Sequence, residues 1–461
     1  MWFSRVLVWV MCASLAVPAG TFAAEQQPYP EALPKTLAVA AFKNGLAFVV
    51  RQGTVQLRGG TGRIAPIPSA TLGTLWMAPG EPNAVLDEVV SYRYGVGEEQ
   101  PRSALRFKIQ GAGEKTDLTL GYLEHGLGWT PSYLISLNDN KTARITMQAV
   151  VMDDAEDLDN TDVFFVVGVP NFAYSETPSP MGLQQNLLAF MKDARRDEAN
   201  GRAYSNAIAG QLMASEFKEL DRMSGDGFSQ AVSELSGAPE EDLFLYSRAG
   251  VTLQRGERAM YNVFTTNVGY EHIYEWEVVD PQRVDGFGNV VNNNPNPAEA
   301  AVRNSIWHSI RLKNDTKFPW TSAPTMVISG MKPVSQDTLP YTPRDASSNL
   351  KITIATDIRS SHEEREVARQ QNIQRRHGYE FDLVTVEGTL KLKNYKSKEV
   401  RVDVGKTLRG EVEAQSDGGK AVKLGEAIQT DNPLSRLSWQ IALKAGEERI
   451  VTYRYKIFVR G

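Results

Sequence analysis

Gly128-Trp129-Thr130-Pro131-Ser132-Tyr133 decides the fold, because runs of alternating apolar residues flank this stretch on both sides. The alternating positions are Leu118, Leu120 and Tyr122 before it, and Tyr133, Ile135, Ile145, Met147, Ala149 and Val151 after it. Apolar residues at every second position are typical of a strand with one buried face. The region Thr116–Asp162 is therefore expected to form paired β-strands around which the rest of the chain is organised.

Trp129 is expected to anchor the core of this sheet. Its indole is a large apolar body with one donor, and Pro131 prevents a helix from forming two residues later. We therefore assign Trp129, Pro131 and Tyr133 to the structural core. An aromatic platform for a sugar or a peptide is the alternative role for Trp129.

An acidic turn follows these strands. Its acids are Asp153, Asp154, Glu156, Asp157, Asp159 and Asp162. Oxygen-rich turns can hold calcium, which makes Asp153, Asp154, Glu156 and Asp157 candidate binding residues. The turn has neither the central glycine nor the terminal glutamate of a helix–loop–helix calcium loop, so a solvated turn is expected. We predict no metal and no cofactor.

The composition describes an ordinary globular chain with a mild excess of acids. Of its 461 residues, 42% are hydrophobic and 23% are charged, which excludes wholesale disorder and allows several domains. The formal net charge is −5. Arg5 is the only charged residue in Met1–Ala24, so the remainder carries −6. This mildly acidic balance argues against nucleic acid as a partner.

The N-terminal segment has the features of a secretory signal peptide. Arg5 precedes the apolar run Val6–Val17, and small residues favour cleavage after Ala23 or Ala24. We expect an exported protein, periplasmic or extracellular, that is at most peripheral to a membrane. Cys12, the one cysteine, lies in this segment, so no disulfides are expected in the mature chain. Intact-mass measurement of exported protein should find this segment removed, and a chain that keeps it would contradict the prediction.

Turn residues and changes in residue pattern divide the chain into regions. The predicted regions are a signal peptide (1–24), a linker (25–35), an N-terminal β domain (36–104), a central sandwich (105–169 with 242–335), an insertion (170–241) and a C-terminal sandwich (349–461). Asn44-Gly45 predicts a tight hairpin turn. Leu183, Leu187 and Phe190 recur at helical spacing, so the insertion is predicted to be helical.

Two short steps of the chain resemble each other. Ile310-Arg311-Leu312-Lys313-Asn314 and Leu390-Lys391-Leu392-Lys393-Asn394 each read as a strand that ends in a polar turn. Their similarity suggests two related sandwiches. Many short strands, glycine turns and no regular alternation of strands with helices predict a mainly β fold. We expect stacked immunoglobulin-like β-sandwiches with one helical insertion.

Four features together resemble one bacterial family. They are Lys43-Asn44-Gly45 after an opening strand, the Trp129–Tyr133 step, the acidic turn before a strand, and Tyr453-Arg454-Tyr455 near the end. The family is the mucoidy-inhibitor-A-like family, domain of unknown function 4139. Its acidic turn commonly reads Gly-Glu-Asp-Trp, where this chain has Ala155-Glu156-Asp157-Leu158. The resemblance implies an exported β-rich envelope protein and implies no particular activity.

His362-Glu363-Glu364-Arg365-Glu366 is similar to the helix of a zinc protease. That motif needs a second histidine four residues after the first, and this chain has Glu366 there. His362 and Glu366 with the distant His377 form an alternative set of metal ligands. A charged surface segment is the expected structure.

A non-enzymatic role is expected, because the sequence shows no motif for nucleophilic or acid–base catalysis. We predict that the protein binds an envelope protein or polysaccharide or acts as a structural module, in an oligomeric state that the sequence leaves open. One alternative is a carbohydrate-binding module that uses Trp76, Trp307 or Trp320. The other is a metal-assisted hydrolase that uses the acidic turn or His362.

Overall fold

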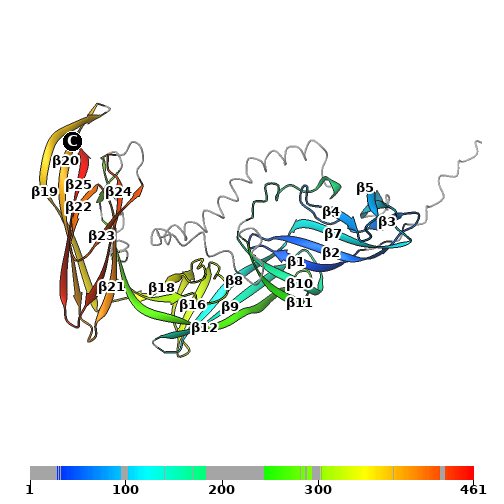
Figure 1. Ribbon diagram of the computed structural model, residues 1–461, viewed down its shortest axis with the longest axis horizontal. Helices are drawn as coiled ribbons and strands as arrows, with labels where there is room; N and C mark the ends of the chain where they lie inside the picture. Colours follow the sequence, from blue (N-terminus) through cyan, green and yellow to red (C-terminus); the bar gives the residue numbers. More distant parts are fainter. Residues whose placement is uncertain are drawn as a thin grey trace, which may run out of the picture.

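The computed structural model describes a chain built almost entirely of β-strands, which confirms the predicted mainly β fold. The described residues are 29, 31, 33–94, 102–139, 141–168, 170–182, 243–280, 282–285, 288–292, 302, 304–376, 378–425 and 431–461. Figure 1 shows an elongated row of sandwiches with the C-terminal one standing crosswise at the end. Within the described part, no helix has the length and apolar character needed to cross a membrane.

The elements follow each other in chain order. The first are β1 (Lys35–Ala41), β2 (Leu46–Gln56), β3 (Thr61–Ile64), β4 (Trp76–Pro79), β5 (Val85–Tyr94), β6 (Arg102–Gln110), β7 (Lys115–His125), β8 (Leu127–Leu137), β9 (Thr142–Asp153), β10 (Leu158–Val167), the 3₁₀ turn η1 (Pro180–Gly182), β11 (Phe244–Leu253) and β12 (Arg258–Val278). The others are β13 (Gln282–Val284), β14 (Val290–Asn292), β15 (Trp307–Lys313), β16 (Ala323–Ser329), β17 (Lys332–Leu339), β18 (Ser347–Ile354), β19 (Ile358–Arg376), β20 (Tyr379–Asn394), β21 (Val400–Arg409), β22 (Glu411–Gln415), β23 (Lys420–Gly425), β24 (Leu434–Leu443) and β25 (Glu448–Arg460).

The strands form four units of one design, which we number from the N-terminus. Each unit has a layer of three antiparallel strands: β1-β2-β7 in unit 1, β8-β9-β12 in unit 2, β12-β15-β18 in unit 3 and β19-β20-β25 in unit 4. The second layers contain β3-β6, β10-β11, β16-β17 and β21-β24 in the same order. The first half of β12 belongs to unit 2 and its second half to unit 3, so one strand serves both.

Successive units are joined edge to edge by parallel strand pairs. The second layer of unit 2 adds β10 to β1, that of unit 3 adds β16 to β8, and that of unit 4 adds β21 to β12. Each sheet therefore combines the three-strand layer of one unit with the second layer of the next. Because main-chain hydrogen bonds cross every boundary, the units are not joined by flexible linkers.

The repeat is visible in a buried polar corner at the end of the second strand of units 2, 3 and 4. The corner residues are Asp153, Asn314 and Asn394, which have no exposed surface. Their amide N–H groups donate to the carbonyls of Glu257, Ala346 and Glu447, at 3.3, 2.8 and 2.9 Å. Their side-chain oxygens accept from the amides of Ala155, Thr316 and Lys396, at 3.1, 3.1 and 2.9 Å. A left-handed residue precedes each carbonyl partner, namely Gly256, Asp345 and Gly446.

The similarity of Ile310–Asn314 to Leu390–Asn394 therefore reflects equivalent strands in units 3 and 4. The acidic turn that starts at Asp153 is the third copy of the same corner, although its sequence differs. The buried asparagine amides also hold neighbouring loops, because Asn314 Nδ2 donates to three carbonyls and Asn394 Nδ2 does the same. Satisfying these buried carbonyls is what a short polar side chain offers at a corner.

The predicted domain boundaries differ from the units at several places, and the predicted end of the central sandwich at 335 divides β17 of unit 3. The boundary at 104/105 divides β6, which pairs with β3 and β5 in unit 1. The predicted start of the last sandwich at 349 divides β18, which belongs to unit 3. A change in local residue composition marks loops, whereas the units are determined by pairing between strands that are far apart in the sequence.

The predicted turn and insertion have different outcomes. Gly45 has a φ of +82° in the tight turn between β1 and β2, as Asn44-Gly45 predicts. The predicted insertion 170–241 separates β10 from β11, where unit 3 has only a short hairpin turn. Its described part, 170–182, contains turns and η1, which gives no support to a helical insertion, and the helical pattern at Leu183–Phe190 lies outside the described residues.

Candidate functional site

A partly buried ionic cluster in unit 4 is the most concentrated polar feature near a predicted site residue. Strand alternation places His362 and Glu364 of β19 on one face, since they are two residues apart. Tyr453 faces them from β25, which lies beyond β20 in the same sheet, Lys406 faces them from β21 in the other sheet, and Asp280 follows the end of β12. Figure 1 shows β19 and β25 in one layer and β21 in the other, so the cluster bridges the two layers.

The lysine lies at the centre of the cluster. Lys406 Nζ donates to both carboxylate oxygens of Asp280 at 2.6 Å and lies 3.3 Å from Glu364 Oε1. The phenol of Tyr453 donates to Glu364 Oε1 at 2.5 Å, and Tyr455 donates to Oε2 at 3.1 Å. The side chain of Lys406 has no exposed surface, so this ammonium depends on its two carboxylate partners.

The histidine completes the ring of contacts. His362 Nε2 lies 2.8 Å from the Tyr453 hydroxyl, and Nδ1 lies 3.5 Å from Asp280 Oδ1. Tyr453 reaches this position because it lies opposite Gly388, where an added Cβ would meet the tyrosine ring at 2.0 Å. Gly388 is therefore required for the cluster to form.

The environment moves the pKa values of the two carboxyls in opposite directions. Burial would raise the pKa of Glu364, but hydrogen bonding to His362 and the charge of Lys406 hold it at about 2. Burial raises the pKa of Asp280, and the charge of Lys406 opposes that rise only in part. Carboxyls with divergent pKa values are typical of acid–base sites, and structural ion networks produce the same pattern.

Asp280, His362 and Glu364 could also offer three ligand atoms to a metal ion, because these atoms lie within 4.8 Å of one another. The ammonium of Lys406 already contacts both carboxylates and offsets one of their two negative charges. A divalent ion would have to displace it, so these residues fit an internal ion network better than a metal site. Glu366, the fourth residue after His362, pairs instead with Arg369 at 2.7 Å, and His377 lies outside the described residues.

The acidic turn is not the solvated turn that the sequence predicts. Asp153 and Glu156 are buried, and Glu156 pairs with Arg51 of β2 and accepts from Tyr122 of β7 at 2.5 Å. The turn therefore clamps unit 2 onto unit 1. The two exposed acids among the candidate binding residues also have partners, since Asp154 pairs with Arg258 at 3.1 Å and Asp157 accepts from the backbone amide of Arg255 at 2.9 Å. Long-range basic partners, which the local sequence does not show, explain the difference.

Glu124 adds a third buried acid to this clamp. Its Oε1 and Asp153 Oδ2 are buried, and no described group hydrogen-bonds to them. Burial, followed by the charge of Glu156, raises the pKa of Glu124 to about 9. Glu124 therefore holds a proton at neutral pH and can donate it to Glu156.

Replacing Glu124 with Gln should stabilise the protein at neutral pH. The folded-state pKa exceeds the unfolded value, so the folded chain keeps a proton that the unfolded chain releases, and stability falls as the pH rises from about 4.5 to about 9. The amide removes that loss, so its advantage should be larger at pH 8 than at pH 5. Urea unfolding at both values measures it, with Glu88→Gln on the exposed surface as the control. An equal effect at the two pH values would contradict the raised pKa.

The three predicted core residues lie where the sequence places them. Trp129 and Tyr133 are buried in the core shared by units 2 and 3, and Pro131 lies between them on β8. Trp129 packs against Phe165 and Tyr246, with ring centroids 5.2 and 6.4 Å away. The aromatic-platform role for Trp129 is therefore excluded by its burial.

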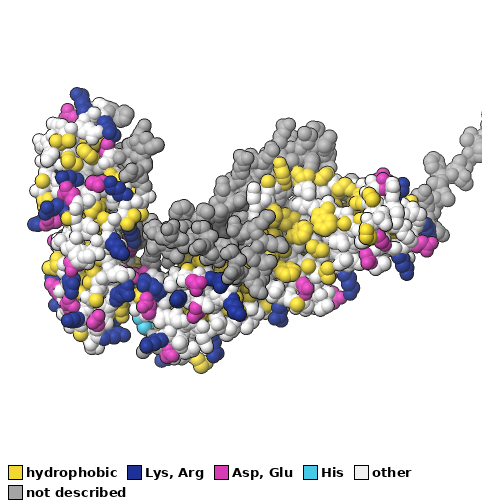
Figure 2. Space-filling view, in the orientation of Figure 1, with side chains coloured by type: hydrophobic (Ala, Val, Ile, Leu, Met, Phe, Trp, Pro, Cys, Tyr) yellow, Lys and Arg dark blue, Asp and Glu magenta, His cyan; other side chains and the backbone are white. Residues whose placement is uncertain are grey.

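The proposed sugar-binding tryptophans do not form one surface. Trp320 is fully buried, which corrects its assignment as an exposed aromatic, and Trp307 is half-buried with Lys351 5.1 Å from its ring. Trp76 is 46% exposed and lies over Gly121 on β7. Figure 2 shows hydrophobic side chains gathered over this part of β1, β2 and β7.

A histidine pair escaped the sequence analysis. His272 Nδ1 and His308 Nε2 lie 2.9 Å apart where units 3 and 4 meet, and Tyr274 stacks on His308. Burial lowers both pKa values, with that of His308 at about 4. The residues are 36 positions apart, so only the pairing of β12 with β15 brings them together.

Comparison with known proteins found no match, because no family model matches the chain and no curated protein is similar to it.

Proposed function

We propose that this protein is an exported, non-enzymatic scaffold that holds envelope components at a fixed spacing. The observation that carries the proposal is the sharing of strands between units, above all β12, whose 21 residues run from unit 2 into unit 3 and accept β21 of unit 4. Bending at a boundary would break main-chain hydrogen bonds in a continuous sheet. A row of sandwiches built in this way favours stiffness over adaptable docking.

The buried charged groups support the same role. The Lys406 cluster ties β12, β19, β21 and β25 together, and the Glu156 clamp ties unit 2 to unit 1. Both clusters pair acids with bases or phenols inside the boundaries between units. These ion pairs and hydrogen bonds fix the relative positions of the units, which is the property that a spacer needs.

Small-angle X-ray scattering of the mature chain tests the stiffness. The wild-type curve should fit one conformation of the units, whereas a Gly-Ser-Gly-Ser insertion between Gly269 and Tyr270 should broaden the distance distribution because it splits β12 between units 2 and 3. The matched control is the same insertion between Gly330 and Met331, a hairpin tip that joins no units. Equal broadening in both variants, or a flexible wild type, would overturn the scaffold.

The hydrolase remains the second candidate because of the carboxyl pair in unit 4. We expect no turnover on glycan, peptide or ester panels, with or without zinc or calcium. Turnover that disappears in both His362→Ala and Asp280→Asn, with the folded structure kept, would replace the scaffold proposal. An envelope protein or polysaccharide is the proposed partner, and crosslinking in intact cells would identify it.

A further inference from the structure

The chain has a free strand edge at one end that is equivalent to the edges joining its units. β1, β8 and β12 each open the three-strand layer of a unit, and each accepts a parallel strand from the following unit. β19 opens unit 4 in the same way and pairs with β20 on one side. On its other side, no described strand pairs with it, because β19 ends the four-stranded sheet.

The strand register identifies the segment of β19 that is equivalent to the accepting segments of β8 and β12. Tyr133 of β8 begins the parallel pairing with β16 and lies opposite Met147, six residues before the corner residue Asp153. Tyr274 of β12 begins the pairing with β21 and lies opposite His308, six residues before Asn314. Glu364 of β19 lies opposite Gly388, six residues before Asn394. The accepting segment of β19 is therefore Glu364–Ala368.

The other end of the chain carries the complementary half of such a junction. In units 2, 3 and 4, the strand that follows the second strand of the three-strand layer pairs in parallel with the preceding unit; these strands are β10, β16 and β21. In unit 1 the equivalent strand is β3, which follows β2. β3 is therefore the strand that should pair in parallel with a preceding layer. Among the described residues, its parallel contact is an isolated bridge between Glu31 and Arg63. The other junctions align four or five residues of each strand, a length that the four residues of β3 can supply.

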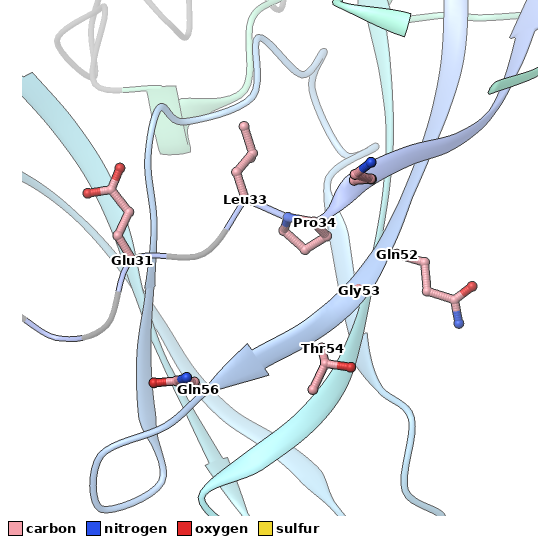
Figure 3. Close-up of a pocket in the computed structure, with 8 residues that line it drawn as sticks. Glu31, Leu33, Pro34, Gln52, Gly53, Thr54 and Gln56 are labelled. Atoms are coloured by element: carbon pink, nitrogen blue, oxygen red, sulfur yellow. The ribbon is translucent and has the colours of Figure 1, made fainter. Parts of the chain in front are cut away.

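The described contact that occupies this position is a single ion pair. Arg63 pairs with Glu31, but Arg63 Nε is buried with no described hydrogen-bond partner. A hollow of about 600 Å³ lies beside the segment and β2, and it is lined by Glu31, Leu33, Pro34, Lys35, Gln52, Gly53, Thr54 and Gln56 (Figure 3). Glu31 therefore lies where the later units place a parallel strand.

We propose that the occupant of the β19 edge is β3 of a second copy of this chain, so that copies join head to tail. Figure 1 shows β19 and β3 at opposite ends of the molecule, as such a contact requires. The carboxylate partner of Arg63, which is Glu31 within one chain, would be Glu366 of the accepting strand, which would exchange its pair with Arg369 for one with Arg63. Because the two surfaces differ, the contact is heterologous and leaves one free edge at each end, from which a ring or a filament can grow.

The charges on β19 are consistent with this use. The third position of the accepting segment is Ile135 in β8 and Trp276 in β12, both buried, and it is Glu366 in β19. Charges on an edge strand prevent indiscriminate pairing, and here they match the arginine of one particular strand. β19 has a bulge between Glu366 and Ala368, inside the accepting segment, whereas the bulge of β1 between Thr36 and Ala38 comes just before the segment that accepts β10.

Cysteine crosslinking tests the contact, because the only cysteine of the chain is Cys12 in the predicted signal peptide. Mature chains carrying Val367→Cys are mixed with chains carrying Thr61→Cys and oxidised. We expect a mixed dimer that forms severalfold faster than either chain dimerises alone. The control replaces Val367→Cys by Met331→Cys, a 94% exposed position on unit 3. Thermal melts confirm that each variant is folded before mixing.

Sedimentation over a wide concentration range gives the second readout. The wild-type mass should rise with concentration, Arg63→Glu should keep the chain monomeric, and removal of the residues before Pro34 should strengthen association. Mixed dimers no faster than the Met331→Cys control, or a monomer throughout, would overturn the proposal. This inference goes beyond the scaffold role, which the scattering experiment tests on single chains, so the two can fail separately.

Discussion

Replacing Trp129 with Ala should lower the free energy of unfolding by about 3–5 kcal/mol, the usual cost of deleting a buried aromatic side chain. The indole has no exposed surface and its Nε1 donates to the Val166 carbonyl at 3.3 Å. It packs on Phe165 of the facing sheet, so the cavity would lie between the layers of unit 2. Dense strand packing on both sides leaves little room for collapse, which favours the upper part of that range.

Urea unfolding followed by circular dichroism measures this loss. Trp76→Ala is the matched control, because its indole is 46% exposed and its removal leaves no closed cavity. The control should change stability far less than Trp129→Ala. Equal stabilities for Trp129→Ala and the wild type would show that the indole does not anchor the core.

Replacing Lys406 with Met should cost about 3–5 kcal/mol, the range for breaking a buried ion pair by removing one partner. The methionine fills the apolar space of the lysine stem but leaves the carboxylates of Asp280 and Glu364 facing each other without a cation. The cost should shrink in acid. Glu364 has a folded-state pKa of about 2, below the unfolded value, so its stabilisation is present above pH 4.5 and is lost as the pH falls through 2.

A triple variant separates the charge effect from packing. Adding Asp280→Asn and Glu364→Gln to Lys406→Met removes the uncompensated charges, so stability should largely return. Lys423→Met is the surface control, since its pair with Glu411 is exposed and should contribute little. A triple variant as unstable as the single one would show that packing, and not charge, makes Lys406 important.

The candidate site was only partly predictable. His362 stands out in the sequence, but the zinc-protease comparison assumes a helix, in which residues four apart share a face. The chain is a strand there, so the partner on the same face is Glu364, two residues on, and Glu366 points to Arg369. Asp280, Lys406 and Tyr453 are distant in the chain, and no local spacing connects them to His362.

The sequence by itself determined the strand content, the tight turn at Asn44-Gly45 and the burial of Trp129, because alternation, turn chemistry and side-chain size act over a few residues. It also carried a trace of the repeat in the two strands that end at Asn314 and Asn394. Tertiary structure alone decided which strands cross unit boundaries, since the energies of parallel pairs depend on residues far apart in the chain. The same long-range pairing buried Asp153 and Glu156, whose basic and phenolic partners lie on other strands.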